Sequence, residues 1–276
     1  MKRGLKRKKG ARLGQHLLTN SGIAFAVAQA AGIQHGDSVL EIGPGTGMLT
    51  QELLALGAHV VAVEKDPVMV AVLKETFAKE IQEKKLEIRE GDARELTPDV
   101  LFPKGIYKVA ANIPYYITGE LVRQCLTAKN QPTSVALLVQ KEVAQRIVGN
   151  PDAGRSGPRL KRRGKESILS LSVKAYGTPK YVKTVGKGSF NPPPAVDSAI
   201  LAITHISREH FKTVSEEKFF EVVKAGFAQK RKTLGGNLKK VFGEKALSAL
   251  SASNVSEKTR AEDVALADWL ELAKNI

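Results

Sequence analysis

The residues that could do chemistry begin with a glycine loop and the acid that follows it. EIGPGTG (41–47) places three glycines between a short apolar run and an amphipathic one, and Glu64 ends the next apolar run, 21 positions after Gly43. In a parallel α/β sheet, ligands bind beyond the carboxyl ends of the strands, and an acid about 20 residues after the glycines meets a ribose hydroxyl pair. The spacing therefore predicts a site for a nucleoside-bearing cofactor rather than a tight turn alone.

The glycine spacing also indicates which cofactor is bound. The loop is G-x-G-x-G, not the G-x-G-x-x-G that brings a helix N-terminus against a pyrophosphate, and Pro44 removes one backbone donor. Both features favour S-adenosylmethionine, which has no phosphates, over NAD. Asp92 in GDA (91–93) ends a third apolar run, where it could accept a hydrogen bond from an adenine amino group. The predicted cofactor-binding residues in these segments are Gly43, Gly45, Glu64, Lys65, Asp92 and Ala93.

Another segment, NIPY (112–115), follows a fourth apolar run and predicts the catalytic step. An exocyclic base amine is a poor nucleophile because its lone pair is delocalised into the ring. The Asn112 side-chain oxygen and a backbone carbonyl can accept hydrogen bonds from such an amine, Pro114 fixes the turn, and Tyr115 offers a stacking face for an extruded base. No strong general base is needed when positioning and electrostatics supply most of the rate. We predict that Asn112, Ile113, Pro114 and Tyr115 are catalytic; the alternative is a cis-proline or turn motif with buried tyrosines.

The elements that must position these segments alternate between apolar strands and amphipathic helices. This alternation predicts an α/β fold with a doubly wound, mostly parallel sheet. Together with the cofactor motifs, it indicates a Rossmann-like sheet of the S-adenosylmethionine methyltransferase type. The helix expected over 66–81 begins at an Asp66 cap with Pro67 in its first position. Strands are expected within 37–43, 59–66, 86–93, 106–114 and 134–140, and helices within 21–31, 48–57, 66–81 and 118–129.

The second half of the chain changes character. ILSLSVKAY (168–176) and SAILAITHI (198–206) are expected as strands on either side of a proline-rich connection. From Ser215 the pattern is helical, with a serine cap and two acids in the first turn. TRAE (259–262) is expected to form a capping box before the last helix. We therefore predict a small all-α C-terminal domain.

The expected organisation has three parts. A basic N-terminal arm covers 1–13, the Rossmann-like methyltransferase domain covers 14–205, and the helical C-terminal domain covers 206–276. Residues 150–166 are basic and broken by Gly and Pro, which predicts an exposed loop rather than a helix or strand.

Charge indicates the partner. The net charge is +15, and three runs (1–12, 155–165 and 229–240) hold 18 positive side chains and no acid, so the rest of the chain is close to neutral. Concentrated runs on a near-neutral body favour a polyanion, with nucleic acid as the leading candidate. The predicted RNA-binding residues are Arg155, Arg159, Lys161, Arg162, Arg163, Lys165, Lys230, Arg231 and Lys232.

Other features exclude several classes of protein. Cys125 is the one cysteine, which excludes disulfides and a cysteine-built metal site, and the five histidines show no metal-ligand spacing, so no metal is expected. No apolar run approaches the ~18 residues of a membrane span, and about 20 polar or basic residues precede the apolar segment near the N-terminus, unlike a signal peptide. We expect a cytoplasmic monomer.

Taken together, the motifs resemble the ribosomal RNA small-subunit adenine N6,N6-dimethyltransferases. The resemblance spans about residues 12–270, with the motifs in family order. It implies dimethylation of N6 of two adjacent adenines near the 3′ end of small-subunit rRNA, with the immature small ribosomal subunit as partner in ribosome biogenesis. It further implies that His16, Leu18 and Asn112 help line the S-adenosylmethionine site, and that Tyr115 and Phe190 clamp the target adenine. The segments that carry the resemblance are EIGPGTG, GDA, NIPY, GQHLL (14–18), LVQKEVAQRI (138–147), SFNPPPAVDSAIL (189–201) and FAQKRKTLGGNL (227–238).

The chain departs from the family pattern in places, and two rivals share its motifs. The family more often has Asn at position 16 and Arg-Asn in place of Gly235 and Gly236, so the role of His16 and the RNA contacts of that loop stay open. One rival is a large-subunit rRNA adenine methyltransferase of the macrolide-resistance type, against which the 227–238 segment argues. The other is a non-catalytic ribosome-assembly or transcription factor on the same fold, which has no reason to keep both the cofactor motifs and NIPY.

Overall fold

The computed structural model describes residues 16–149 and 165–276, in which a seven-stranded sheet is the central feature. The strand order is β4-β3-β2-β5-β6-β9-β7; β2 to β6 run parallel to one another, whereas β9 pairs antiparallel with both β6 and β7. This confirms the predicted α/β fold with a mostly parallel sheet. The strands are β2 (Ser38–Ile42), β3 (His59–Glu64), β4 (Leu86–Glu90), β5 (Lys108–Asn112), β6 (Ser134–Gln140), β7 (Thr178–Val185) and β9 (Ser198–Thr204).

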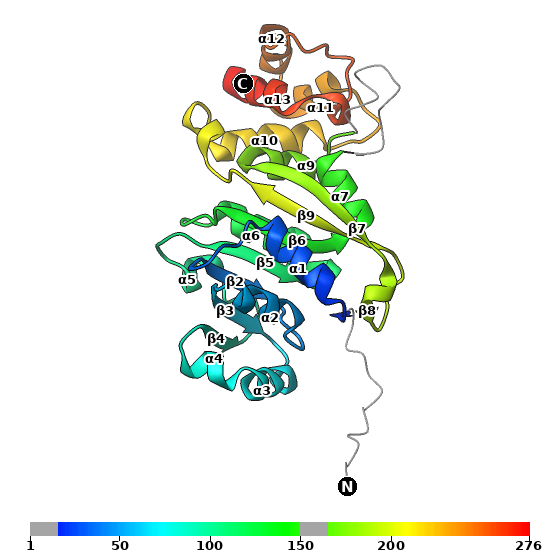
Figure 1. Cartoon of the computed structure of the whole chain (residues 1–276). Coiled ribbons are helices and arrows are strands. Elements are labelled where there is room, and N and C mark those ends of the chain that lie inside the picture. The colour runs from blue at the N-terminus through cyan, green and yellow to red at the C-terminus, as the bar shows by residue number, and fades with distance from the viewer. Residues whose placement is uncertain (1–15, 150–164) are drawn as a thin grey trace.

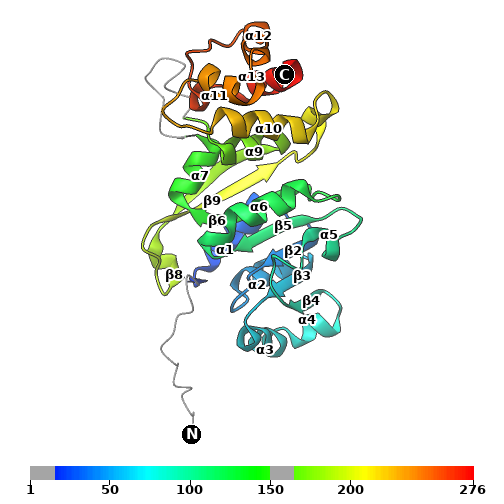
Figure 2. The same cartoon turned by 180° about the vertical axis from the view of Figure 1, so that it is seen from behind.

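Helices cover both faces of the sheet (Figures 1 and 2). Two apolar clusters, one on each side, form the core between sheet and helices. The strands β5 and β6 are buried on both faces, as expected for the centre of a parallel sheet. One face carries α1 (Ser21–Ala30), α2 (Met48–Ala55), α3 (Pro67–Thr76) and α4 (Ala78–Gln82), and the other carries α5 (Pro98–Leu101), α6 (Thr118–Thr127), α7 (Lys141–Val148) and α9 (Ile168–Tyr176).

The expected helix over 66–81 is divided in two at Phe77. Its start is confirmed, because the Asp66 side chain accepts a hydrogen bond from Val68 N at 2.9 Å and Pro67 is the first helical residue. Phe77 has non-helical dihedrals (φ −112°, ψ 31°), and its ring lies beneath Gly47 of the glycine loop. The break therefore places an aromatic ring under the predicted cofactor site.

The prediction of a strand at 168–176 is wrong, because this segment forms the helix α9. Ser167 caps the helix: its hydroxyl accepts from Ser170 N at 3.1 Å, and the Ser170 hydroxyl accepts from Ser167 N at 2.7 Å. The helix packs on two sides, since Val173 belongs to the sheet core and Leu171 to the core of the C-terminal region. Burial on two sides gave the segment a density of apolar residues that resembles a buried strand.

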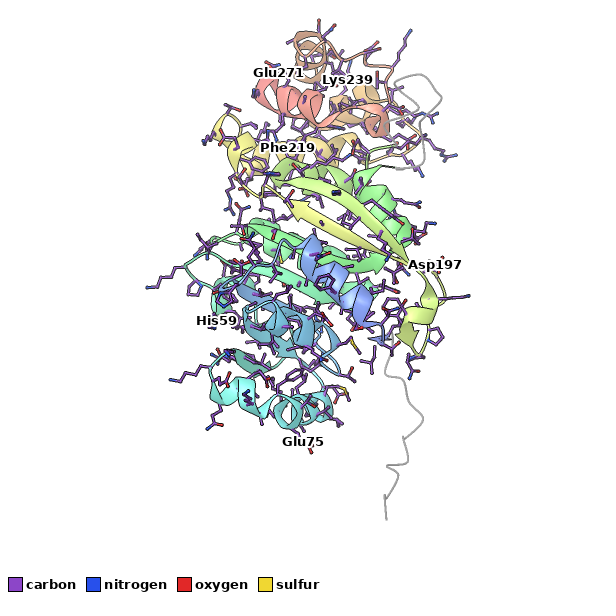
Figure 3. All side chains as sticks on the ribbon, viewed as in Figure 1. His59, Glu75, Asp197, Phe219, Lys239 and Glu271 are labelled. Carbon is purple, nitrogen blue, oxygen red and sulfur yellow. The ribbon has the colours of Figure 1, made fainter. Side chains whose placement is uncertain are left out.

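The C-terminal region is helical, as predicted. Its helices are α10 (Glu216–Gly226), α11 (Leu234–Phe242), α12 (Lys245–Ala252) and α13 (Leu266–Asn275). Ser215 caps α10 as expected, with its side chain accepting from Lys218 N at 3.1 Å. The helices enclose a separate apolar core around Trp269 and Phe219, both fully buried; Phe219, labelled in Figure 3, belongs to the helix next to the sheet domain.

The predicted capping box at 259–262 is wrong. Residues Ala261–Asp263 form a short 3-10 helix, and α13 begins after Ala265 without a side-chain cap. The backbone before this turn instead binds the start of α11, where the carbonyls of Thr259 and Glu257 accept hydrogen bonds from Leu234 N (2.7 Å) and Gly235 N (3.0 Å). The segment that was expected to cap α13 therefore helps to cap the N-terminus of α11.

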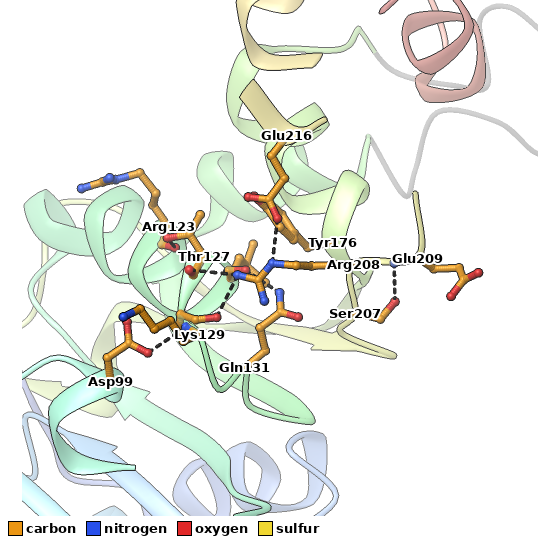
Figure 4. A network of polar contacts seen from close by, with 12 residues as sticks. Asp99, Arg123, Thr127, Lys129, Gln131, Tyr176, Ser207, Arg208, Glu209 and Glu216 are labelled. Carbon is orange, nitrogen blue, oxygen red and sulfur yellow. Dashed lines mark hydrogen bonds and ion pairs between the residues drawn. The ribbon is translucent and has the colours of Figure 1, made fainter. Parts of the chain in front are cut away.

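Arg208 joins the helical region to the sheet domain (Figure 4). Its guanidinium donates to Glu216 Oε1 at 2.7 Å, at the start of α10, and to the carbonyls of Thr127 and Ala128 at 3.0 and 2.9 Å, at the end of α6. Tyr176, the last residue of α9, donates its hydroxyl to Glu216 Oε2 at 2.9 Å. Arg208 therefore ties α6 to the start of α10, and Tyr176 adds a bond from α9 to the same glutamate.

A small two-stranded sheet joins the segment near the N-terminus to the proline-rich connection. The strand β1 (Leu17–Leu18) pairs antiparallel with β8 (Phe190–Asn191), which follows the 3-10 turn Lys187–Ser189. Thr19 N reinforces this pairing by donating to the carbonyl of Ser189 at 2.9 Å. The segment near the N-terminus is thereby fixed against the proline-rich connection.

Candidate active site

The glycine loop turns sharply between β2 and α2. Gly43 has a φ of +70°, and a side chain there would meet the carbonyl oxygen of Asn112 at 3.2 Å. Gly47, at φ +86°, precedes α2, where a side chain would collide with Phe77 at 2.4 Å. Glycine is required at both positions because the backbone is left-handed and has no space for a side chain. The close approach of Gly43 to Asn112 brings the first and the last predicted motifs into contact.

Glu64 is buried at the end of β3 and organises the loop. It is 2% exposed, and its carboxylate accepts hydrogen bonds from Gly45 N at 3.0 Å and Asp66 N at 2.9 Å. Each carboxylate oxygen keeps a second acceptor position, because an ionised carboxylate has about four lone-pair sites. Glu64 also lines a cleft of about 470 Å³, so a ribose can reach these acceptors.

The loop does not offer a cradle for phosphates. Gly43 N donates to the carbonyl of Val63 at 3.0 Å, Gly47 N donates to the carbonyl of Pro44 at 2.9 Å, and Gly45 N donates to Glu64. Pro44 has no N–H to give. A diphosphate would meet an acidic side chain where a dinucleotide loop presents amides, which fits a cofactor without phosphates.

Asp92 lies in the same cleft but is already fully paired. Its two oxygens accept from Arg94 Nη2 (2.6 Å), Arg94 Nε (3.0 Å), Arg94 N (3.0 Å) and Lys65 Nζ (2.8 Å). These bonds, those from Arg94 above all and then those from Lys65, hold the pKa of Asp92 well below its usual range. An adenine amine that binds Asp92 has to replace one of the two cations. Sequence reasoning missed Arg94, whose position two residues after Asp92 in a turn was the available signal.

Glu41, the first residue of the glycine motif, is a buried acid beneath the site. Burial raises its pKa to about 8; the hydrogen bond from Thr50 Oγ1, at 2.7 Å, opposes the rise and the charge of Glu64 adds to it. The other oxygen of Glu41 has no hydrogen-bond partner among the described residues. The raised pKa favours the neutral form of Glu41.

Asn112 stands at the end of β5 beside the glycine loop. Its Nδ2 donates to the carbonyl of His16 at 3.2 Å, so the side-chain oxygen Oδ1 points away from that carbonyl. His16 is held in turn by a hydrogen bond between its Nδ1 and the carbonyl of Pro192 at 2.8 Å. The β1–β8 pair thus orients the amide through His16, a role that does not require the Asn more usual at this position.

The two predicted aromatic clamps differ in accessibility. Tyr115 is half-buried; its hydroxyl bonds Ser198 Oγ at 2.6 Å, its ring lies 5.8 Å from the ring of His16, and burial raises its pKa. Phe190 is 4% exposed and packs in the core beneath β1. Phe190 therefore offers no open face to a base in this structure. Pro114 follows a trans peptide bond, since the one cis bond in residues 16–149 and 165–276 precedes Pro192.

The cleft brings most of the predicted cofactor residues together. It is lined by Gly43, Glu64, Lys65, Asp92 and Ala93, together with residues that sequence reasoning missed. A smaller pocket beside it is lined by His16, Leu18, Gly43, Gly45 and Asn112. The missed lining residues include Arg94 and Tyr116, and the Tyr116 side chain is 72% exposed at the rim.

The predicted RNA-binding residues are distributed differently. Arg155, Arg159, Lys161, Arg162 and Arg163 lie outside the described residues. Lys165 is exposed and forms an ion pair with Glu262 of the C-terminal region. Lys230, Arg231 and Lys232 are exposed on the segment between α10 and α11, far along the chain from the cleft.

Other groups take no part in the site. Cys125 is buried in α6, and burial raises its pKa to about 12. Within the described ranges, no group of three or more His, Cys, Asp or Glu side chains is placed to hold a metal ion. The same residues contain no helix that is both long and apolar enough to cross a membrane.

Comparisons with known proteins agree with this geometry. The family model described as ribosomal RNA adenine dimethylase matches residues 6–276. A protein from Dehalococcoides mccartyi named ribosomal RNA small subunit methyltransferase A is 37% identical over 97% of this chain and 88% of its own length. A protein of the same name from Lactobacillus acidophilus is 33% identical over 96% of this chain and 90% of its own length.

Solved structures give the same result for the fold. A dimethyladenosine transferase from Plasmodium falciparum superimposes with a TM-score of 0.75 and 30% identity over 93% of this chain and 96% of that one. The 23S rRNA methyltransferase ErmE superimposes with a TM-score of 0.71 over 94% of this chain and 98% of that one; at 23% identity this likeness concerns the fold. The glycine loop, Glu64, Asp92 and NIPY therefore occur here on the fold of methyltransferases, in a chain that the family model matches over residues 6–276. The chain belongs to the ribosomal RNA adenine dimethylase family.

Proposed function

We propose that the chain uses S-adenosylmethionine to dimethylate N6 of two adjacent adenines near the 3′ end of small-subunit rRNA, during ribosome biogenesis. Family membership and the names of relatives 33–37% identical over nearly the whole chain support the reaction and its RNA class. The observation that carries the proposal is the approach of the Asn112 backbone carbonyl to the glycine loop, where its oxygen lies 3.2 Å from the Cβ that a side chain at Gly43 would have. This approach supports the assignment of Asn112, at the end of β5, as an amine acceptor beside the cofactor cleft.

S-adenosylmethionine fits the residues that line the cleft. When bound, it supplies an electrophilic methyl group on a sulfonium. Glu64 would accept both ribose hydroxyls through the acceptor positions that Gly45 N and Asp66 N leave open. Asp92 would accept the adenine amine after exchange of Lys65 or Arg94, and Lys65, with its side chain 69% exposed, is the easier of the two to displace.

Asn112 and a neighbouring carbonyl would position the target amine. The hydrogen bond to His16 fixes the amide so that Oδ1 can accept from the amine. The carbonyl of Pro114 already accepts from Ile117 N at 3.2 Å, so we assign the second acceptor to Ile113. Two acceptors on one amine favour its pyramidal form as the methyl group arrives, which stabilises the transition state more than the ground state. The new N–C bond would form as the bond between the methyl group and sulfur breaks, which leaves a neutral thioether, and the amine then gives its proton to solvent.

Tyr115 is the proposed stacking face for the extruded adenine. Its hydroxyl is anchored to the buried Ser198 by a bond of 2.6 Å, which fixes the plane of the ring. Phe190 could join as a second face only if the β1–β8 pair moves, because its ring is buried. We keep Tyr115 as the principal clamp.

Basic residues of the loop 155–165 and of 230–232 are proposed RNA contacts. Phosphate contacts position an enzyme on RNA without reading sequence, so these residues are expected to set affinity rather than the methylated base. We further propose that the chain acts as a cytoplasmic monomer, with a basic arm (1–13) and a division between the sheet domain and the helical domain near residue 205.

The experiment that tests this function uses labelled S-adenosylmethionine and separated ribosomal subunits that lack the modification. We expect label on two adjacent adenines of the small subunit; label on the large subunit would favour the macrolide-resistance type of enzyme, and no label on either would favour a non-catalytic assembly factor. Asn112→Ala should depress single-turnover methylation by a hundredfold or more, on the order of 3 kcal/mol in the barrier, with RNA affinity retained. Asn275→Ala, at the far end of α13, is the matched control. If Asn112→Ala keeps methylation within about threefold, Asn112 is a structural turn residue.

A further inference from the structure

The edge strand β7 presents a row of lysines beside the candidate active site. Lys180, Lys183 and Lys187 are exposed, the first two on β7 and the third in the turn that leads to β8. No carboxylate of the described residues lies within 4.0 Å of their amines. These three cations lie outside every basic run that the sequence singled out.

A β-bulge places two of the lysines on one face of the sheet. Lys180 is opposite Ala202 and Lys183 is opposite Ile200, because the register shifts at Val182. Without the extra residue, side chains three positions apart would point to opposite faces. With it, Lys180 and Lys183 share a face and lie about 7 Å apart along the strand, two residues of β9 at roughly 3.4 Å each. Like charges at this distance repel each other, and no carboxylate of the described residues lies close enough to offset this repulsion.

The neighbouring elements on that face do not neutralise the lysines. Ile200 and Val185 belong to the core cluster that α1 covers, and α1 (SGIAFAVAQA) carries no charged residue. Asp197, at the edge of the sheet in Figure 3, accepts a hydrogen bond from Lys187 N at 3.2 Å rather than from the amine. The net charge of this face is therefore positive.

Protection of the sheet edge is the rival explanation for these lysines. Charged side chains on edge strands, lysine above all, block pairing with other chains. The opposite edge, β4, shows that solution: Glu87, Arg89 and Glu90 alternate in sign, and Arg89 pairs with Glu87 at 2.5 Å. The β7 edge instead carries charge of one sign.

This lysine row leads into the wall of the active site. The turn that holds Lys187 continues into β8, which pairs with β1. Thr19 N donates to the carbonyl of Ser189 at 2.9 Å. The backbone carbonyl of His16, two residues before Leu18, accepts a hydrogen bond from the side-chain amide of Asn112. A strand of phosphates along the lysine row would therefore approach Asn112 from the β8 side.

From this juxtaposition we infer that Lys180, Lys183 and Lys187 form a phosphate-binding track, which guides the RNA strand next to the target adenines toward Asn112. The inference rests on the proposed function and extends it with a docking surface. The partner is RNA because the row offers spaced single cations and no apolar groove, which suits a phosphate backbone.

The test replaces all three lysines with glutamine and measures affinity for RNA and for small subunits against salt concentration. Each phosphate contact on a single strand contributes on the order of 0.7 to the slope of log affinity against log salt. The triple variant should flatten the slope by about two units, which corresponds to a loss of up to about a hundredfold at 0.1 M salt. The triple arginine variant keeps the charge and should retain both slope and affinity.

Controls separate this inference from its rivals. Lys74, Lys84 and Lys104 are exposed, lie toward the other side of the sheet domain and make the matched triple glutamine variant, which should bind RNA as the unaltered protein does. Equal slopes for the two glutamine variants would overturn the track. Association of the β7 variant with itself at an unchanged salt slope would also overturn it, in favour of edge protection. Because the slopes are measured as binding, they remain informative even if the unaltered protein fails to methylate subunits, which is the outcome that would refute the proposed function.

Discussion

Glu41 leads to a specific prediction about stability and pH. Its side chain is 0% exposed, it receives one hydrogen bond, from Thr50, and its second oxygen has no partner among the described residues. Burial raises the pKa from 4.5 to about 8, with the charge of Glu64 adding to the rise. The folded protein therefore holds a proton that the unfolded chain releases above about pH 4.5.

The direction and size of the effect follow from proton linkage. Between the unfolded and folded pKa values, the folded state binds more protons than the unfolded state, so stability decreases as pH rises. The slope is at most about 1.4 kcal/mol per pH unit, and the decrease ends near pH 8, where the folded protein also loses the proton. Glu41→Gln keeps the shape and stays neutral, so it should remove this contribution. The stability of the unaltered protein relative to the variant should fall by on the order of 3 kcal/mol from pH 5 to pH 8.

The assay is urea unfolding followed by circular dichroism at pH 5, 6, 7 and 8 for both proteins. Taking the difference between the two proteins cancels the titration of groups that the substitution does not affect. Equal m-values would establish that both unfold by the same process. If the two stability curves run parallel from pH 5 to pH 8, Glu41 is not protonated in the folded state and the reasoning is refuted. Thr50→Val provides a further check, because loss of the hydrogen bond that lowers the pKa should extend the decrease above pH 8.

Three further predictions concern cofactor binding by Glu64, the glycine loop at Gly47, and the contacts of Arg208 between the sheet domain and the helical region. Glu64→Ala should weaken S-adenosylmethionine binding on the order of ten- to a hundredfold, since a charged hydrogen-bond partner contributes ~1.5–3 kcal/mol; calorimetry on the folded variant measures it. Gly47→Ala combines a left-handed backbone with a collision against Phe77 and should lower the unfolding free energy by about 2–4 kcal/mol, whereas Gly105→Ala, at φ +92° with open space, should cost about 1 kcal/mol. Arg208→Ala should lower the unfolding free energy by about 1–3 kcal/mol, measured in urea, because two carbonyls and one carboxylate lose their donor.

The sheet and its motifs could be predicted from sequence because their signals are local. Apolar strands alternating with amphipathic helices give the parallel sheet, and Asp66 and Ser215 cap their helices as the sequence indicates. The errors arose where distant contacts decide the outcome. The segment 168–176 is helical because it packs between two cores, and residues 259–262 do not cap α13 because their backbone caps α11.

The candidate site shows the same division. The spacing of the glycine loop, Glu64 and Asp92 predicted one cleft, and the structure brings these residues to one cleft. Sequence could not predict that Arg94 and Lys65 occupy the Asp92 carboxylate, because both ion pairs depend on how the β4 turn folds back on β3. Nor could it predict that Phe190 is buried, since its burial depends on pairing with a segment more than 170 residues earlier in the chain.

The helix α6 connects the proposed catalytic turn to the C-terminal region. It begins at Thr118, directly after the turn that contains Tyr115, and its last carbonyls bind Arg208, which also holds Glu216 of α10 (Figure 4). One face of α6 is buried in the sheet core, and ten residues at 1.5 Å each give a rigid element about 15 Å long. A shift of the helical region would therefore reach the catalytic turn through a helix that moves as a unit, rather than dissipate in a flexible linker. RNA held by the cations at 230–232 and along β7 would be fixed relative to Asn112 from two sides, which is the positioning that transfer to a weakly nucleophilic amine requires.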